Sequence, residues 1–205
     1  MSEVLIVDYG MCNLDSIGRA VEECGGRPII SDNPKDLTSA THIILPGVGA
    51  FPDGMKNINE LGFKKALDQQ VLNRGIPFLG ICLGMQLMAR KGHEGGEMDG
   101  LGWIDGEVRR LQPKGEDSRI PHIAWNEVYP QQESPLFEQI EPGKDFYFVH
   151  SYVIECDDES QVLATTPYAG GFTSAVCKGN IFGVQFHPEK SQKAGFQLIR
   201  NFLSL

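Results

Sequence analysis

The chain has 205 residues, of which 41% are hydrophobic, which is enough to bury a core as a single domain over residues 1–205. Its 27 acidic and 18 basic residues give a net charge of −9, which argues against nucleic acid as a partner. The apolar runs are too short to span a membrane, and we expect no signal peptide. Five cysteines without C-x-x-C spacing favour free thiols in the cytoplasm over disulfides or a zinc site. We therefore expect a cytoplasmic protein without a metal.

The first part of the chain alternates between candidate strands and candidate helices. The apolar run at 3–7 is typical of a central parallel strand that is covered on both faces. Asn13 can cap a helix whose apolar residues recur at helical spacing, and Gly25-Gly26 ends it. The further elements predicted here are strands at 27–30 and 42–45, a short helix from Asp32-Asn33-Pro34 and an amphipathic helix at 63–72. This alternation predicts an α/β fold with a doubly wound, mostly parallel sheet.

The pattern changes between Trp103 and Val176. Short β-like pieces such as 106–111 and 146–149 alternate with loops there, which predicts an antiparallel extension of the sheet. A final helix at 194–203 should bury Phe196, Ile199 and Phe202 or Leu203.

The stretch Gly80-Ile81-Cys82-Leu83-Gly84 places a cysteine between two residues without side chains. It follows a short apolar strand at 75–79 and opens a predicted helix at 83–90. This is the nucleophile-elbow pattern with sulfur in place of oxygen, in which the backbone is strained and the neighbours must be small. The helix N-terminus would favour the thiolate, and the Leu83 N–H would face an oxyanion. The alternative is a buried structural cysteine, because free cysteine often packs as a small hydrophobe.

A base for this cysteine is available in Phe186-His187-Pro188-Glu189. Val184 and Phe186 alternate with polar residues like the end of a core strand, and Pro188 stops the ladder just after His187. Glu189 can fold back onto one ring nitrogen of His187 and fix its tautomer while the other nitrogen takes the thiol proton. A structural strand-end histidine is the alternative for His187 alone. Cys82, His187 and Glu189 are the predicted catalytic residues.

A glycine-containing turn, Pro46-Gly47-Val48-Gly49, follows the third predicted strand, where open α/β sheets place their ligand crevices. A dinucleotide loop fails here because Pro52 stands near the position of the third glycine of G-x-G-x-x-G. The turn is either purely structural or a place where the backbone approaches a ligand. Gln86 lies one helical turn after Cys82 and can face the same pocket or solvent. The other polar features are interpreted as structural: a solvated turn at 93–99 rather than a metal loop, and His42 and His150.

The motifs GICLGMQ at 80–86 and FHPE at 186–189 resemble the signature pair of the class I (triad) glutamine amidotransferases. Over essentially its whole length the chain is also similar to the glutaminase subunits of imidazole glycerol phosphate synthase, an enzyme of histidine biosynthesis. The segments that carry this likeness are 8–14, 45–51, 121–128, 147–152 and 187–191. The resemblance implies a flavodoxin-like amidotransferase fold and hydrolysis of glutamine to glutamate and ammonia, without a cofactor.

The resemblance also assigns residues around the nucleophile. It implies an oxyanion hole of Gly47, Val48, Gly49 and Leu83, in which one peptide of the glycine turn is expected to reorient before its N–H faces the intermediate. It further implies that Gln86, Ser151 and Tyr152 bind glutamine. In this scheme Cys82 attacks the side-chain amide, His187 protonates the departing ammonia, and water hydrolyses the thioester.

The implied partner is a synthase subunit of the (β/α)8 barrel type, which forms a heterodimer with the glutaminase. It receives the ammonia and makes imidazole glycerol phosphate and an aminoimidazole carboxamide ribotide. The positions that match the family's partner-facing residues are Asn13, Arg19, His122, Trp125, Asn126, Tyr147 and Lys190.

Two departures from the family pattern lie beside this implied interface. Cys12 stands where the family usually has glycine, and Ile123-Ala124 stands where it has methionine and glycine. These substitutions keep open a paralogue that supplies ammonia to another synthase, for example one that amidates a surface-polysaccharide sugar. Two alternatives come from other functional classes. The chain could be a stand-alone γ-glutamyl cysteine hydrolase, or a binding module whose triad is silent.

Overall fold

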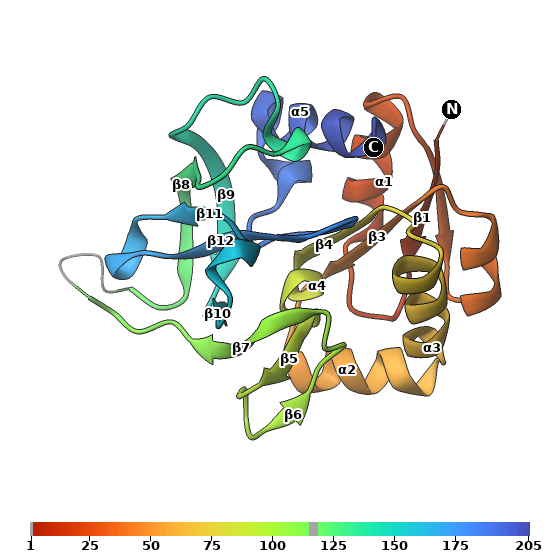
Figure 1. Ribbon diagram of the computed structural model, residues 1–205, viewed down its shortest axis with the longest axis horizontal. Coiled ribbons are helices and arrows are strands. Elements are labelled where there is room, and N and C mark those ends of the chain that lie inside the picture. The colour runs from red at the N-terminus through yellow and green to blue at the C-terminus, as the bar shows by residue number, and fades with distance from the viewer. Residues whose placement is uncertain (1, 115–118) are drawn as a thin grey trace.

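The computed structural model describes residues 2–114 and 119–205. Within these residues the main sheet has the strand order β2-β1-β3-β4-β13-β12-β11-β8-β9, and a second sheet has the order β10-β7-β5-β6 (Figure 1). The pairings from β2 to β13 are parallel. Those from β13 to β9 are antiparallel. The predicted doubly wound α/β sheet with an antiparallel extension is confirmed, although the extension also forms a sheet of its own.

The elements of the structure have the following bounds. The parallel strands are β1 (Glu3–Val7), β2 (Arg27–Ser31), β3 (His42–Gly47), β4 (Phe78–Cys82) and β13 (Ile181–Val184). The antiparallel strands of the main sheet are β8 (His122–Pro130), β9 (Lys144–His150), β11 (Val162–Thr166) and β12 (Phe172–Lys178). The second sheet contains β5 (Ala89–Gly92), β6 (Met98–Asp99), β7 (Ile104–Arg110) and β10 (Tyr152–Cys156). The α-helices are α1 (Leu14–Glu23), α2 (Phe51–Glu60), α3 (Phe63–Leu67), α4 (Leu83–Gln86) and α5 (Gln192–Leu203).

Strand β1 lies between two apolar layers, as its continuous apolar sequence predicts. Val4 and Ile6 point into the core that contains the buried faces of α1 and α5. Leu5 and Val7 point into the core that contains α2 and α3. Successive residues of a strand face opposite sides of a sheet, so this run fills both layers. The two helix pairs accordingly lie on opposite faces of the parallel strands (Figure 1).

Two helices predicted from the sequence are shorter in the structure. The helix expected at 83–90 ends at Gln86, because Ala89–Gly92 pairs with β7 and β6 as a strand. The helix expected at 63–72 is α-helical only to Leu67 and continues as a π-helical segment over Asp68–Asn73. Strand pairing and local packing outweigh helix propensity in both places. Asn13 occupies the N-cap position of α1, but its side chain makes no capping hydrogen bond.

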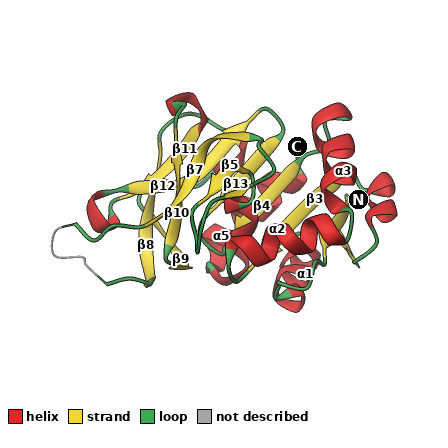
Figure 2. Cartoon of the chain, turned by 90° about the horizontal axis from the view of Figure 1, so that it is seen from below, coloured by secondary structure: helices red, strands yellow, loops and turns green. Residues whose placement is uncertain are grey.

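The extension comprises β8, β9, β11 and β12 of the main sheet together with the second sheet, in which β7 pairs antiparallel with β10 but parallel with β5. Long helices cover the parallel strands, whereas the extension carries only short helical turns (Figure 2).

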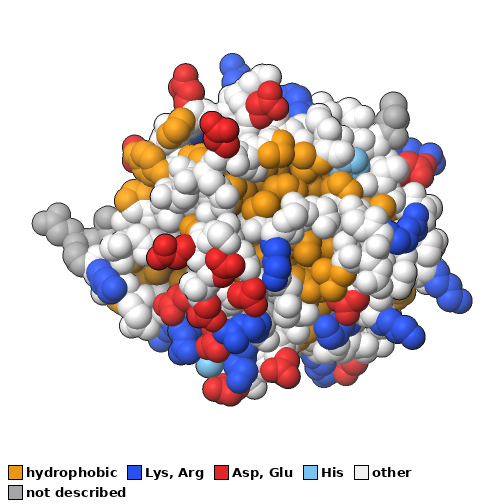
Figure 3. All heavy atoms as spheres, viewed as in Figure 1, with side chains coloured by type: hydrophobic (Ala, Val, Ile, Leu, Met, Phe, Trp, Pro, Cys, Tyr) orange, Lys and Arg blue, Asp and Glu red, His pale blue; other side chains and the backbone are white. Residues whose placement is uncertain are grey.

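Acidic and basic side chains gather over β5 and β7, at the lower left of the face in Figure 3, while hydrophobic side chains lie nearer its middle. In the described part of the chain, no helix is both long and apolar enough to cross a membrane.

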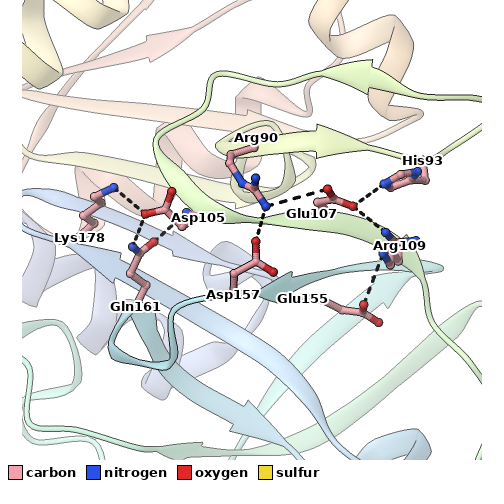
Figure 4. Close-up of polar contacts among 9 residues, drawn as sticks. All are labelled: Arg90, His93, Asp105, Glu107, Arg109, Glu155, Asp157, Gln161 and Lys178. Carbon is pink, nitrogen blue, oxygen red and sulfur yellow. Dashed lines mark hydrogen bonds and ion pairs between the residues drawn. The ribbon is translucent and has the colours of Figure 1, made fainter.

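The charged side chains of the second sheet form a linked group that Figure 4 shows in detail. Arg90 pairs with Asp157 and approaches Glu107. Glu107 also contacts His93 at 2.7 Å and Arg109 at 2.6 Å. These pairs join β5, β7 and the end of β10. Most of the side chains are partly exposed, so each pair is worth only about 0–1 kcal/mol.

Candidate active site

Cys82 lies at the turn between β4 and α4 with φ 54° and ψ −108°, a conformation that residues other than glycine rarely adopt. The flanking glycines are required by close packing. A Cβ on Gly84 would lie 1.8 Å from the carbonyl oxygen of Leu45, and one on Gly80 would lie 2.7 Å from that of Gly84. The structure thus has the strained elbow that the pattern predicts, with a helix of only one turn behind the sulfur.

His187 follows β13 by three residues and is anchored on both sides. Its backbone N–H donates to the carbonyl of Tyr147 at 2.9 Å, and its own carbonyl accepts from the hydroxyl of Ser191 at 2.6 Å. Its ring Nδ1 lies 2.8 Å from Glu189 Oε1, and both side chains are almost fully buried. Because a carboxylate accepts, Nδ1 carries the proton and Nε2 is left to face the cysteine side.

The charge on His187 is set by opposing effects. Burial disfavours the imidazolium, but Cys82 and then Glu189 more than offset it and raise the pKa of His187 from 6.5 to about 9. Among the described side chains, His187 Nε2 and Glu189 Oε2 are buried atoms without a hydrogen-bond partner. A buried ring nitrogen beside a thiol, with no other partner, is suited to exchange a proton with it.

A cavity of about 230 Å³ opens beside Cys82. Its lining residues are Val48, Gly49, Cys82, Leu83, Gln86, Glu94, Val149, His150, Ser151 and Tyr152. The structure therefore brings the predicted glutamine contacts together around the predicted nucleophile. A concave site of this size with a few convergent polar groups suits a small ligand.

Three residues near Cys82 carry no signal in the sequence. Glu94 belongs to the turn that is predicted to be solvated, but it lines the cavity and its Oε2 accepts from the N–H of Phe51 at 2.8 Å. His150, which is predicted to be structural, also lines the cavity. Gln185 is fully buried and its amide nitrogen lies 3.7 Å from Cys82 Sγ. Only the folded arrangement reveals them, because no local motif marks these residue types.

Gln86 is held in place by its amide group. Its Nε2 donates to the carbonyl of Tyr152 at 2.9 Å and to Gln185 Oε1 at 3.1 Å. The side chain is buried, so the solvated-surface alternative is wrong. Gln86 thereby ties α4 to β10 across the cavity.

The glycine turn after β3 runs beside the elbow, because Gly47 pairs with Cys82 in the parallel ladder. The N–H of Val48 donates to the carbonyl of Met11 at 2.7 Å. Cys12 Sγ contacts the carbonyl of Pro46 at 3.2 Å. The loop after β1 therefore engages the peptides on both sides of Gly47, and the Val48 N–H is committed to that loop.

The predicted partner-facing residues divide into exposed and buried members. Lys190 lies 5.8 Å from the ring centre of Tyr147, and the Tyr147 and Trp125 rings are 5.9 Å apart. Trp125 and Lys190 are exposed, as are Asn13 and Arg19 of the α1 region, whereas Tyr147 and Asn126 are partly buried. The helix α1 packs against the turn that holds Lys190.

The prediction for His122 needs correction, because only 1% of its surface is exposed. Its ring stacks on Tyr168 with centres 4.0 Å apart, and its Nδ1 lies 2.9 Å from His150 Nε2. Asn126 Nδ2 lies 2.7 Å from its Nε2. Burial, together with His122, lowers the pKa of His150 from 6.5 to about 3, so that ring is neutral and accepts from His122. The side chain of His122 is therefore a core group behind the surface rather than part of it.

Comparison with known proteins agrees with this geometry. The family model for class-I glutamine amidotransferases matches residues 5–204. The chain is 46% identical to the imidazole glycerol phosphate synthase subunit HisH 1 of Campylobacter jejuni strain RM1221, with 98% of this chain and 100% of the relative covered. It is 45% identical to subunit HisH of Moorella thermoacetica, with 98% and 94% covered.

A solved structure described as a glutamine amidotransferase has the same fold, with a TM-score of 0.76 at 19% identity, and covers 98% of this chain and 97% of that chain. The family match over nearly the whole sequence and the relatives above 40% identity lead to one assignment. The chain belongs to the class-I glutamine amidotransferase family.

Proposed function

We propose that this chain is the glutaminase subunit of an imidazole glycerol phosphate synthase. In this role it hydrolyses glutamine, and the ammonia passes to a (β/α)8 barrel subunit that makes imidazole glycerol phosphate and aminoimidazole carboxamide ribotide. The names of relatives that are 45–46% identical over almost their whole length support the pathway. The strained elbow at Cys82 beside the buried His187–Glu189 pair is the observation that carries the chemistry.

Catalysis requires the Cys82 thiol proton to be on His187 Nε2, and the raised pKa of His187 favours this imidazolium form. The thiolate attacks the side-chain amide carbon of glutamine and forms a C–S bond, and the carbonyl oxygen becomes an oxyanion. As the intermediate collapses, the C–N bond breaks and the imidazolium gives its proton to the departing ammonia. Water then attacks the thioester with His187 as base, which releases glutamate and restores the thiol. Glu189 keeps the ring in the tautomer that both steps need.

The oxyanion would be stabilised by backbone N–H groups of Leu83 and of the segment Gly47–Gly49. Leu83 begins α4 immediately after the nucleophile, so its N–H lies at the helix N-terminus. The N–H of Val48 is engaged by Met11, and the Gly47–Val48 peptide must turn before this donor reaches the intermediate. This supports a glutaminase that is nearly idle until its partner favours the turned state.

Glutamine recognition uses the groups that line the cavity. Glu94 supplies a carboxylate that suits the α-ammonium group of an amino acid. Ser151 and Tyr152 line the same cavity, and Gln86 Oε1 stays available because the bonds of that side chain use its nitrogen. A cavity of about 230 Å³ accommodates the side chain and backbone groups of one amino acid such as glutamine.

The docking surface for the barrel would include Trp125, Tyr147 and Lys190. They lie in one row of ring and cation–ring contacts. The Tyr147 carbonyl accepts from the backbone N–H of His187, so a surface residue and the proposed base share a backbone hydrogen bond. Asn13 and Arg19, near α1, would extend this surface.

The test is glutamine turnover by the purified chain, with and without the histidine-pathway barrel subunit and its nucleotide ligand. We expect little turnover alone and strong stimulation by the complex. Robust hydrolysis alone that no barrel changes would favour a stand-alone hydrolase.

Stimulation by a different synthase only would move the protein to a paralogous pathway. That second candidate is favoured by Cys12 and Ile123-Ala124, which depart from the family pattern near the docking surface. Several relatives also bear numbered names, such as subunit HisH 2 of Pseudomonas aeruginosa, which is 41% identical over 98% of this chain and 99% of its own length.

A further inference from the structure

Tyr9 carries a buried hydroxyl that the proposed reaction does not use. The residue follows β1 by two positions, and 1% of its surface is exposed. Within residues 2–114 and 119–205, its hydroxyl oxygen has no hydrogen-bond partner. Burial, with contributions from Cys12 and Cys82, raises the pKa of Tyr9 well above its usual value, so the group remains a protonated donor. An unpaired buried donor is rare in folded proteins and calls for an explanation.

The position of this hydroxyl connects it to the glycine turn. A Cβ built on Gly47 would lie 2.0 Å from the hydroxyl oxygen, 3.0 Å from Leu83 Cβ and 3.3 Å from the backbone nitrogen of Gly84. The hydroxyl therefore lies against Gly47, between the end of β3 and the first turn of α4. Tyr9 does not belong to the cavity lining described above, so its hydroxyl faces backbone rather than substrate.

Turning the Gly47–Val48 peptide creates a need for a donor at this place. In the observed state the Val48 N–H donates to Met11. A peptide is planar, so a turn that carries this N–H toward Cys82 carries the Gly47 carbonyl toward the side it left. That oxygen would then face the carbonyl of Met11, and two acceptors without a donor repel each other.

We infer that Tyr9 is a positioning residue whose hydroxyl donates to the turned Gly47 carbonyl and so stabilises the oxyanion-binding conformation. The inference rests on the proposed function, in which this peptide turns before catalysis. It explains why the donor is buried but unpaired in the observed state. It also explains why position 47 is glycine, since a Cβ there would occupy the place of the hydroxyl.

Cys12 contacts the other peptide of Gly47. Its Sγ contacts the carbonyl of Pro46 at 3.2 Å, and burial raises the pKa of Cys12 to about 12, so the thiol stays protonated and donates. The Pro46 carbonyl belongs to the Pro46–Gly47 peptide, so this contact does not change when the Gly47–Val48 peptide turns. Cys12 therefore offers a control within the same loop.

The test compares Tyr9→Phe with the wild-type protein, both as the isolated chain and in complex with the barrel subunit. Removing the unpaired hydroxyl stabilises the observed state, so the melting temperature should rise by roughly 2–4 °C. The kcat for glutamine should fall about tenfold with KM unchanged, as for loss of one hydrogen bond in the reactive state. Alkylation of Cys82 by iodoacetamide, which forms no oxyanion, should proceed at the wild-type rate.

Two matched variants sharpen the result. Tyr129→Phe removes an exposed hydroxyl that bonds Glu127, and it should leave melting temperature and kcat unchanged. Cys12→Ala removes a thiol contact to the Pro46 carbonyl, whose peptide does not turn, so kcat should stay near the wild-type value. The amide resonance of Val48 in ¹⁵N spectra should move on complex formation in the wild type and move less in Tyr9→Phe.

Normal kcat in Tyr9→Phe, in the isolated chain and in the complex, overturns the inference and leaves the proposed function intact. A fall in both stability and kcat would assign Tyr9 an ordinary packing role and also overturn it. A wild-type chain that the barrel does not stimulate contradicts the proposed function. In that case the isolated chain's own turnover in Tyr9→Phe still decides the role of the hydroxyl.

Discussion

The parallel strands and the antiparallel extension contribute different parts of the site. Strands β3 and β4 end at Gly47 and Cys82, and His187 follows the end of β13, so the proposed catalytic groups come from neighbouring parallel strands. The extension supplies walls instead: the junction of β9 and β10 at 149–152, and Glu94 after β5. Strand pairing fixes the spacing of the first set, whereas loops carry the second. The extension thus contributes only to the proposed binding of glutamine, whereas the parallel strands and α4 contribute to both proposed roles.

The largest effect should come from the parallel strands. Cys82→Ser should lower glutaminase activity at least about 10³-fold, because a serine is a poor nucleophile in a site suited to a thiolate. The fold should survive, since the change is nearly isosteric, and a circular dichroism melt would check this. Labelling with diazo-oxo-norleucine should map to Cys82 by mass spectrometry. Label at Cys12, Cys24, Cys156 or Cys177 would contradict the assignment.

The base and its carboxylate should differ in importance. His187→Asn should reduce kcat ~10²- to 10⁴-fold, since the ring carries the proton. Glu189→Gln should be milder, because the amide can still hold the ring through a neutral hydrogen bond. Steady-state kinetics of both variants measure this order. Negligible loss in both would remove the pair from the mechanism.

The titration of His187 tests its electrostatic interactions with Cys82 and Glu189. Cys82 is the larger of the two influences that raise the pKa of His187 to about 9, and burial opposes it. In Cys82→Ala burial should prevail over the remaining effect of Glu189, and the pKa should fall markedly. Glu189→Gln should lower it less. An NMR titration of the imidazole resonances measures both, and an unchanged value in Cys82→Ala would show that the two side chains do not interact.

A substitution of a cavity-lining residue from the extension should change the binding of glutamine rather than the catalytic steps. Glu94→Gln keeps an oxygen that can accept from Phe51 but removes the charge, so KM for glutamine should rise about tenfold with kcat nearly unchanged. Glu97→Gln is the control, since Glu97 pairs with Lys91 at the surface. A fall in kcat with normal KM in Glu94→Gln would show that this carboxylate takes part in the catalytic steps. That result would contradict its assignment to substrate binding alone.

The smallest effect should come from the charged group of the second sheet. Asp157→Asn weakens the contact with Arg90 at an exposed pair (Figure 4). The free energy of unfolding should fall by less than about 1 kcal/mol, and kinetics should not change. Urea denaturation provides the measurement. A large loss would mean that these pairs act as a network that holds the wall in place.

The same contrast explains what could be predicted from the sequence. The run at 3–7 is apolar on both faces and gives a strand with the observed bounds, and the glycines at 80 and 84 reveal a turn that only they can make. Such signals are local, since the physical cause lies within a few residues of the pattern. The parallel strands and the turn that carries Cys82 are therefore predictable from the sequence, whereas the order of the strands is not.

The structure of the extension is harder to predict from the sequence, because it depends on pairings between distant segments. Ala89–Gly92 becomes a strand through β6 and β7, which no helical pattern at 83–90 can reveal. Only the fold brings Glu94 to the cavity and Gln185 to Cys82. His122 lies in a segment predicted to face the partner, yet its ring contacts His150 inside the molecule. Residues whose roles depend on contacts across the chain carry no signal of their own.

The contact between Gly84 and the Leu45 carbonyl limits how this protein can evolve. Since any side chain at position 84 would push β3 away from α4, a saturation library at this position should return only glycine. A change at position 84 would therefore require a compensating shift at the end of β3. Mutations that change the range of substrates should therefore occur in the loops of the extension. A change of length or charge there leaves the register of the parallel strands unaltered.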